Sequence, residues 1–127
     1  EVGKPYLVKV DSTSPSAFSL VGEVPPRTGQ TGAIQFALLG NSSICKWNFI
    51  SIPLDQSSIT NAERLALAIG NGNITKELLA WNSSQQRFDS WIPDSQFPPP
   101  GGFGTNFSVQ IGYPYFVCIA AAGINWP

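Results

Sequence analysis

Short apolar runs, separated by proline, glycine and polar turn residues, make up most of this chain. Runs of this length, bounded by turn residues, are typical of β-strands rather than helices. Pro114 interrupts the last run. Because proline has no backbone N–H, it is expected to bend that strand or to place it at a sheet edge. The predicted strands span residues 5–10, 17–24, 33–40, 44–52, 78–81, 87–91 and 107–121.

One segment has the pattern of a helix instead. Thr60 and Glu63 have the spacing of a capping box, in which a hydroxyl and a carboxylate satisfy free backbone amides at the helix start. Gly70 supplies a left-handed stop. Three apolar residues lie partly on one side of the stretch between them: Leu65, Leu67 and Ile69. The pattern predicts a short helix near residues 61–69, with room for another turn around 73–77.

The polar stretch within residues 81–88 separates two strands that carry aromatic residues, which predicts a β-hairpin. Trp81, Phe88 and Trp91 are expected to stack across it, with both tryptophans mostly in the core. Together these elements predict an all-β fold with one short α-helix near residues 61–69. We expect a mainly antiparallel β-sandwich of the immunoglobulin-like or pilin-like kind.

Composition excludes several classes of protein. Charged residues make up only 12% of the 127 residues, and the net charge is -1. This balance argues against disorder and against nucleic-acid binding, which needs a basic surface. No run of about 18 apolar residues is present, so no membrane span is expected. Histidine is absent, and no two acids have a spacing that forces their carboxylates together. We therefore predict no catalytic activity, no cofactor and no metal site.

The two cysteines, Cys45 and Cys118, each lie in an apolar, strand-like run. They are either two buried free thiols or one disulfide that closes a loop of roughly seventy residues. By the chain-entropy model such a bridge stabilises the fold by about 4 kcal/mol. It would also imply an oxidising compartment.

Asparagine context points to the same compartment. The glycosylation acceptor pattern, Asn-x-Ser/Thr, occurs at Asn41, Asn73, Asn82 and Asn106. The numbers of asparagine, serine and threonine in the chain predict only about one such site by chance. Asn-Ser pairs are also common in turns, which is the alternative explanation. We expect an extracellular or cell-surface glycoprotein.

An internal repeat links the two ends of the chain. Residues 1–10 read EVGKPYLVKV and residues 110–119 read QIGYPYFVCI. At this offset Gly3, Pro5, Tyr6 and Val8 each meet an identical residue. The chain therefore resembles one repeat unit preceded by the last strand of another. Residues 1–10 are then a donor-like strand, residues 11–17 a hinge, and residues 18–127 the body.

Two accounts of the repeat follow. The chain is a piece of a tandem array, or residues 1–10 leave their own body and complete the sheet of a neighbouring copy. In the second account a head-to-tail contact grows an open filament. The residues expected to make this polymerisation contact are Val2, Pro5, Tyr6, Leu7, Val8 and Val10. The resident copy at residues 110–119 is an obstacle, because two strands cannot share one position.

Three strings carry a resemblance to known proteins: NFISIPLD (48–55), WNSSQQRFDSW (81–91) and GTNFSVQIGYPYFV (104–117). They resemble repeat domains of large secreted or surface proteins of bacteria and archaea, a family that implies no clear activity. The architecture is more loosely similar to donor-strand pilins and archaeal thread subunits, which implies polymerisation through an N-terminal strand.

The leading hypothesis is an extracellular structural subunit that polymerises with copies of itself into a pilus-like or thread-like surface filament. One alternative is a unit of a tandem-repeat surface or adhesion protein. Another is a carbohydrate-binding module, in which tryptophan and tyrosine rings would take surface glycans as partners.

Overall fold

The computed structural model describes residues 26–27, 29–31, 33–53, 56–94 and 101–127. It confirms the predicted all-β, mainly antiparallel fold with a short helix near residues 61–69. The predicted strands at 5–10 and 17–24, with the hinge at 11–17, lie outside the described residues. The elements in chain order are β1 (Phe36–Leu38), β2 (Lys46–Ser51), α1 (Ala62–Ile69), α2 (Asn71–Ile74), β3 (Thr75–Asn82), β4 (Arg87–Pro93), β5 (Gly102–Gly104), β6 (Pro114–Ile119) and β7 (Ile124–Trp126).

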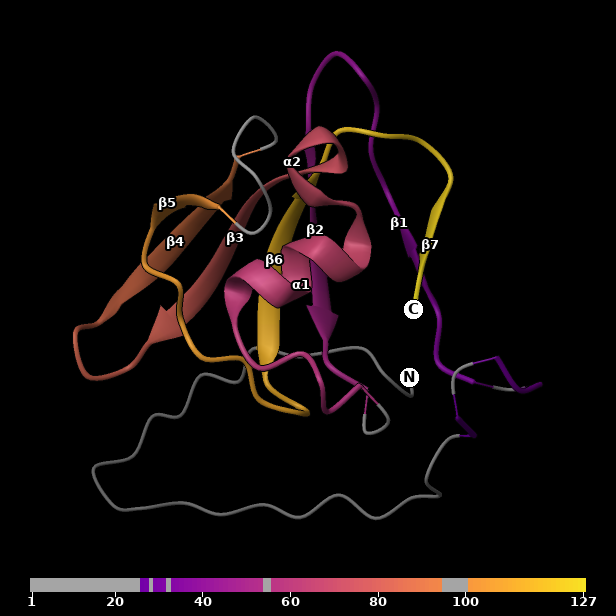
Figure 1. Ribbon diagram of the computed structural model, residues 1–127, viewed down its shortest axis with the longest axis horizontal. Coiled ribbons are helices and arrows are strands. Elements are labelled where there is room, and N and C mark those ends of the chain that lie inside the picture. Colours follow the sequence, from indigo (N-terminus) through magenta and orange to yellow (C-terminus); the bar gives the residue numbers. More distant parts are fainter. Residues whose placement is uncertain (1–25, 28, 32, 54–55, 95–100) are drawn as a thin grey trace, which may run out of the picture.

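The larger sheet has five strands in the order β2-β6-β3-β4-β5, and all of its pairs are antiparallel. In Figure 1 the helices α1 and α2 lie in front of this sheet. The smaller sheet pairs β1 with β7, so that Phe36 faces Trp126. Strand β6 therefore lies inside the larger sheet, paired with β2 on one side and β3 on the other, whereas β2 and β5 are its edges among the described residues.

Pro114 does not bend a long strand, and it does not place that strand at the edge. It is the first residue of β6. Before it, residues 107–113 make only isolated bridges, Ile52 with Ile111 and Asn61 with Ser108. Proline is tolerated at the first position of a strand, since the ladder there does not require its missing N–H.

Helix α1 covers one face of the larger sheet. It buries Ala62, Leu65, Ala66 and Ile69, whereas Leu67 is 39% exposed. The predicted apolar stripe was therefore wrong at Leu67, because residues 62, 65, 66 and 69 share the helix face with period 3.6. The core between helix and sheet is completed by buried side chains that include Ile50, Ile52, Leu78, Trp91, Tyr115, Val117 and Ile119.

The start of α1 also differs from the predicted capping box. The N-cap is Asn61, not Thr60, and its side-chain oxygen accepts a hydrogen bond from the Arg64 amide at 2.9 Å. The amide of Glu63 donates to the side-chain oxygen of Asn106 at 3.1 Å, so a distant asparagine takes part in the cap. The helix ends at Gly70 as predicted, with φ +152° and a hydrogen bond from its amide to Ala66.

The region after Gly70 holds one short helix and then a strand. Helix α2 ends at Ile74, and β3 begins at once with Thr75, where the predicted extra turn was to continue to residue 77. The predicted hairpin of residues 81–88 is confirmed: Asn82 pairs with Arg87 and Trp81 with Phe88. Within the described residues, no helix is long and apolar enough to cross a membrane.

Candidate functional site: the outer face of the sheet

The face of the larger sheet that lies opposite α1 carries a row of apolar side chains. Successive residues of a strand point to opposite faces, so the buried residues Ile50, Val117 and Leu78 assign their neighbours to the other side. We call that side the outer face. Its large apolar side chains are Trp47 and Phe49 of β2, Phe116 of β6, Leu79 and Trp81 of β3, Phe88 and Ile92 of β4, and Phe103 of β5.

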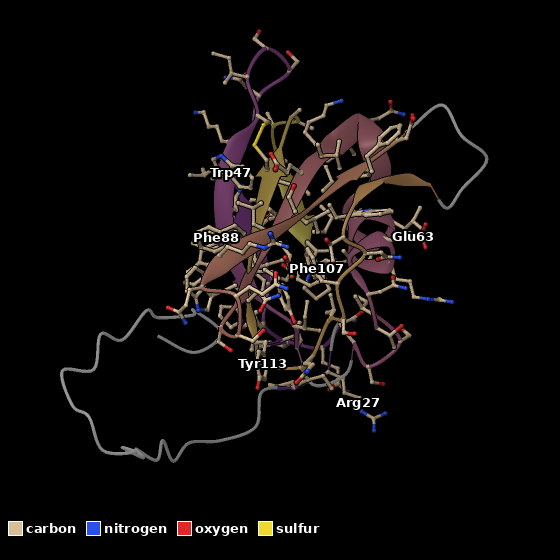
Figure 2. All side chains as sticks on the ribbon, turned by 90° about the vertical axis from the view of Figure 1, so that its left-hand side faces the viewer. Arg27, Trp47, Glu63, Phe88, Phe107 and Tyr113 are labelled. Carbon is tan, nitrogen blue, oxygen red and sulfur yellow. A yellow bond between two sulfur atoms is a disulfide. The ribbon has the colours of Figure 1, made fainter. Side chains whose placement is uncertain are left out.

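Most of these side chains are open to solvent. Trp47, Phe88 and Ile92 are each 46% exposed, Trp81 is 50% exposed and Phe103 is 60% exposed. Figure 2 shows Trp47 and Phe88 on the side of the sheet away from Glu63 of α1. Large apolar side chains gathered on one surface mark a site of interaction more often than scattered ones do.

Four rings of the outer face form a continuous chain across β2, β6, β4 and β3. Phe49 and Phe116 stack with their ring centres 4.5 Å apart. Phe88 meets Phe116 edge-to-face at 5.7 Å and Trp81 at 5.1 Å. Such pairs each add about 0.5–1.5 kcal/mol beyond area burial, so the rings hold one another in place without covering the surface.

Two predictions about the tryptophans were wrong: that Trp81 is mostly buried, and that Trp91 stacks with Trp81 and Phe88. Trp91 is in the core, 7% exposed, as expected, but Trp81 is half exposed rather than buried. Trp81 and Phe88 touch across the hairpin as predicted. Trp91 cannot join them, because it lies on the opposite face, where it pairs with Leu78.

The polar groups of the outer face are few. Ser90 of β4 donates a hydrogen bond from its hydroxyl to the Glu77 carboxylate at 2.6 Å. Other polar contacts near the end of the hairpin lie on the opposite face, which Leu78 and Trp91 share: Asn82 donates from its side-chain amide to Asp89 at 2.9 Å, and Arg87 lies 3.6 Å from the same carboxylate. Within the described residues, no group of three or more histidine, cysteine or acidic side chains could hold a metal ion.

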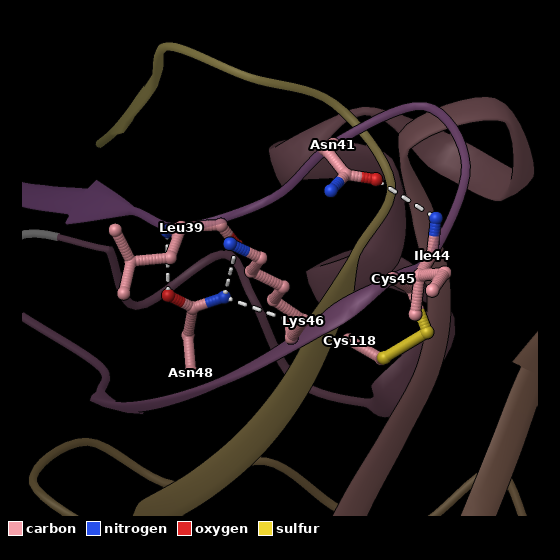
Figure 3. Close-up of a disulfide and its surroundings, with 7 residues drawn as sticks. All are labelled: Leu39, Asn41, Ile44, Cys45, Lys46, Asn48 and Cys118. Carbon is pink, nitrogen blue, oxygen red and sulfur yellow. Dashed lines mark hydrogen bonds between the residues drawn. A yellow bond between two sulfur atoms is a disulfide. The ribbon is translucent and has the colours of Figure 1, made fainter.

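The two cysteines form a disulfide, with their Cα atoms 5.4 Å apart and a sequence separation of 73. The bridge ties the chain just before the edge strand β2 to the neighbouring interior strand β6 (Figure 3). Near it, Asn48 of β2 acts as a substitute for a backbone peptide group. Its side-chain oxygen accepts from the Leu39 amide at 2.7 Å, and its NH₂ group donates to the Leu39 carbonyl at 2.8 Å and the Lys46 carbonyl at 3.0 Å.

The four predicted glycosylation sites lie away from the outer face. Asn106 contacts the start of α1, and Asn73 lies within α2. Asn41 is in the loop before β2, where its side-chain oxygen accepts from the amides of Ser43 and Ile44. Asn82 is at the hairpin. Asn41, Asn73 and Asn106 are exposed, whereas Asn82 is half-buried.

The Asn73 acceptor pattern has an unusual third residue. Thr75 is fully buried at the start of β3, and its hydroxyl makes no hydrogen bond with the described residues. A buried hydroxyl without a partner destabilises a fold by about 1–3 kcal/mol. The Thr75 hydroxyl therefore does not stabilise the fold, and a methyl group in its place would pack better.

The predicted polymerisation residues between Val2 and Val10 lie outside the described residues, but their counterparts do not. Gly112 has φ +76° in the turn before β6, and Pro114 opens the strand. The Tyr115 hydroxyl accepts from the Gln110 amide at 2.8 Å, which closes that turn. Burial raises the pKa of Tyr115 above its ordinary value. Sequence reasoning did not find this role of the tyrosine hydroxyl, although the repeat marked the residue.

Comparison with known proteins gives no match to a family model, to a curated protein or to a solved structure.

Proposed function

We propose that this chain is a non-enzymatic structural unit of an extracellular surface protein, joined in series to other units of its own fold. One observation carries the proposal: residues 110–119, which match residues 1–10, include the interior strand β6. The disulfide and the exposed acceptor asparagines support the extracellular part of the proposal.

The shared residues have specific tasks in β6. Gly112 takes a left-handed backbone conformation, Tyr115 closes the turn, and Val117 is fully buried between sheet and helix. Residues 1–10 keep a glycine, a tyrosine and a valine at the same three positions. They therefore have the pattern of a strand that is paired on both sides within a unit of this fold.

Residues 114–119 already hold the β6 position of this unit, so residues 1–10 fit that position in a different one. In the tandem account, residues 1–10 supply the β6 strand of a preceding unit in the same polypeptide. This arrangement needs no rearrangement of the present unit. Strand donation to a separate copy is the second candidate. It is favoured by β2, a six-residue strand at the edge of the sheet among the described residues, since a sheet edge is where an added strand can pair.

The internal repeat supplies its own matched control. In the tandem account, Val8→Asp leaves the free energy of unfolding of the chain unchanged within about 0.5 kcal/mol, because residue 8 belongs to another unit. Val117→Asp, the same change at the matching position, buries a carboxylate in the core and is expected to prevent folding. Urea unfolding followed by tryptophan fluorescence measures both.

Negative-stain electron microscopy of the same proteins separates the two candidates. The tandem account predicts dispersed particles for the native chain and for Val8→Asp. Uniform filaments of the native chain that disappear with Val8→Asp would establish strand donation instead. Under conditions in which the native chain is a dispersed monomer, a loss of more than about 1 kcal/mol of stability in Val8→Asp would contradict both accounts, because residues 1–10 would then belong to this unit.

A further inference from the structure

We infer that the outer face of the five-stranded sheet is a contact surface for the outer face of a second copy of this chain. The inference rests on the proposed function, because units joined in series place copies close together. It adds a lateral contact between sheet faces to the serial connection made by residues 1–10.

Exposed apolar side chains are concentrated on this face. Ten large apolar side chains are exposed among the described residues, and five of them lie on the outer face. The other five are dispersed over a loop, the helix and the turn before β6. The five on the outer face are Trp47, Trp81, Phe88, Ile92 and Phe103.

The outer face carries almost no charge. Among the described side chains assigned to the outer face, Glu77 is the only one that ionises, and its carboxylate already accepts the Ser90 hydroxyl. Burying an unpaired charge is costly, whereas a charge that keeps a hydrogen-bond partner costs less. Two such faces can therefore meet with aromatic rings against aromatic rings. A strongly charged partner would find only Glu77 as a charged group on this face.

The acceptor asparagines lie away from the outer face. All four lie on the helix side, in a loop or at the hairpin, and none is among the side chains of the outer face. Glycans at these positions would cover other parts of the surface and leave the outer face accessible. This distribution is the one expected for a protein contact.

The size of the face sets the strength of the contact. Five strands about 4.8 Å apart and about six residues long cover roughly 19 Å by 20 Å, or about 400 Å². Stable complexes bury about 800 Å² per partner, so separate copies should associate only weakly. Units linked in one polypeptide experience effective concentrations in the millimolar range, which are sufficient to populate a weak contact.

Sedimentation equilibrium of the full chain, from about 10 µM to about 1 mM, tests the inference. The mean mass should rise toward that of a dimer at the upper end of this range. Trp81→Ser and Trp47→Ser should each reduce the association at least about tenfold. Tyr113→Ser is the matched control: Tyr113 is 58% exposed but lies in the turn before β6, and its loss should leave the association unchanged.

Three results would overturn the inference. The first is a constant mass up to the highest concentration. The second is association that survives both tryptophan substitutions but is lost with Val8→Asp, which would assign it to residues 1–10. The third is a constant mass together with binding of a neutral soluble β-glucan, lost in the tryptophan variants, which would make the face a saccharide platform. The tandem account is judged separately, by the stability of Val8→Asp.

Discussion

Replacing Asn48 with alanine should weaken the connection between β2 and the end of β1. The Asn48 side chain holds both backbone groups of Leu39, at 2.7 Å and 2.8 Å. A hydrogen bond of this kind contributes about 1 kcal/mol net, so the two bonds together give about 2 kcal/mol. Leu39 is 65% exposed, so water replaces part of what is lost and 2 kcal/mol is an upper value.

Urea unfolding with the disulfide intact measures this effect. With a denaturant dependence of about 2 kcal/mol per molar, Asn48→Ala should lower the unfolding midpoint by up to about 1 M. Asn48→Asp should be no better, because a carboxylate accepts from the Leu39 amide but repels its carbonyl. Asn125→Ala is the control: Asn125 is exposed in β7, and its side chain makes no hydrogen bond with the described residues. A shift in Asn48→Ala no larger than in Asn125→Ala would refute the reasoning.

Two further predictions concern the core. Reducing the Cys45–Cys118 disulfide should lower the free energy of unfolding by about 4 kcal/mol, because the bridge closes a long loop in the unfolded chain. Urea unfolding with and without reductant measures this difference. A variant with both Cys45→Ser and Cys118→Ser should behave like the reduced protein. Thr75→Val should raise the free energy of unfolding by about 1 kcal/mol, because it removes a buried hydroxyl that has no hydrogen-bond partner among the described residues. Thr105→Val, at an exposed position, is the control and should change the free energy of unfolding little. A destabilised Thr75→Val would contradict the prediction, because it would show that the hydroxyl has a partner.

The elements were predictable wherever the pattern is local. The strands around Lys46–Ser51 and Arg87–Pro93 and the helix before Gly70 follow from alternation and from turn residues. The N-cap was assigned one residue too early, because Thr60 and Asn61 both have capping side chains. The choice between them is made by Ser108, which pairs with Asn61, and by Asn106, which takes the Glu63 amide. Contacts of that sequence separation are not visible in a local pattern.

The candidate site was less predictable than the fold. Alternation shows that Leu79 and Trp81 share a face, but not which face of the sheet helix α1 covers. Once α1 packs against Leu78, Trp81 must lie on the open side. Composition alone favoured a buried tryptophan, because aromatic residues usually fill the core of a small β domain. The exposure of Trp81 is therefore a consequence of tertiary packing.

The position of the disulfide has a mechanical consequence. The two bridged cysteines are 73 residues apart in sequence, so the segment between them forms a closed loop that contains the helices and most of the larger sheet. Extended fully, this segment would span about 250 Å. Tension applied to the two ends of the chain passes through the bridge and bypasses the loop. A unit under load can therefore lengthen only by the residues outside the bridge, and reducing one covalent bond releases the remaining length.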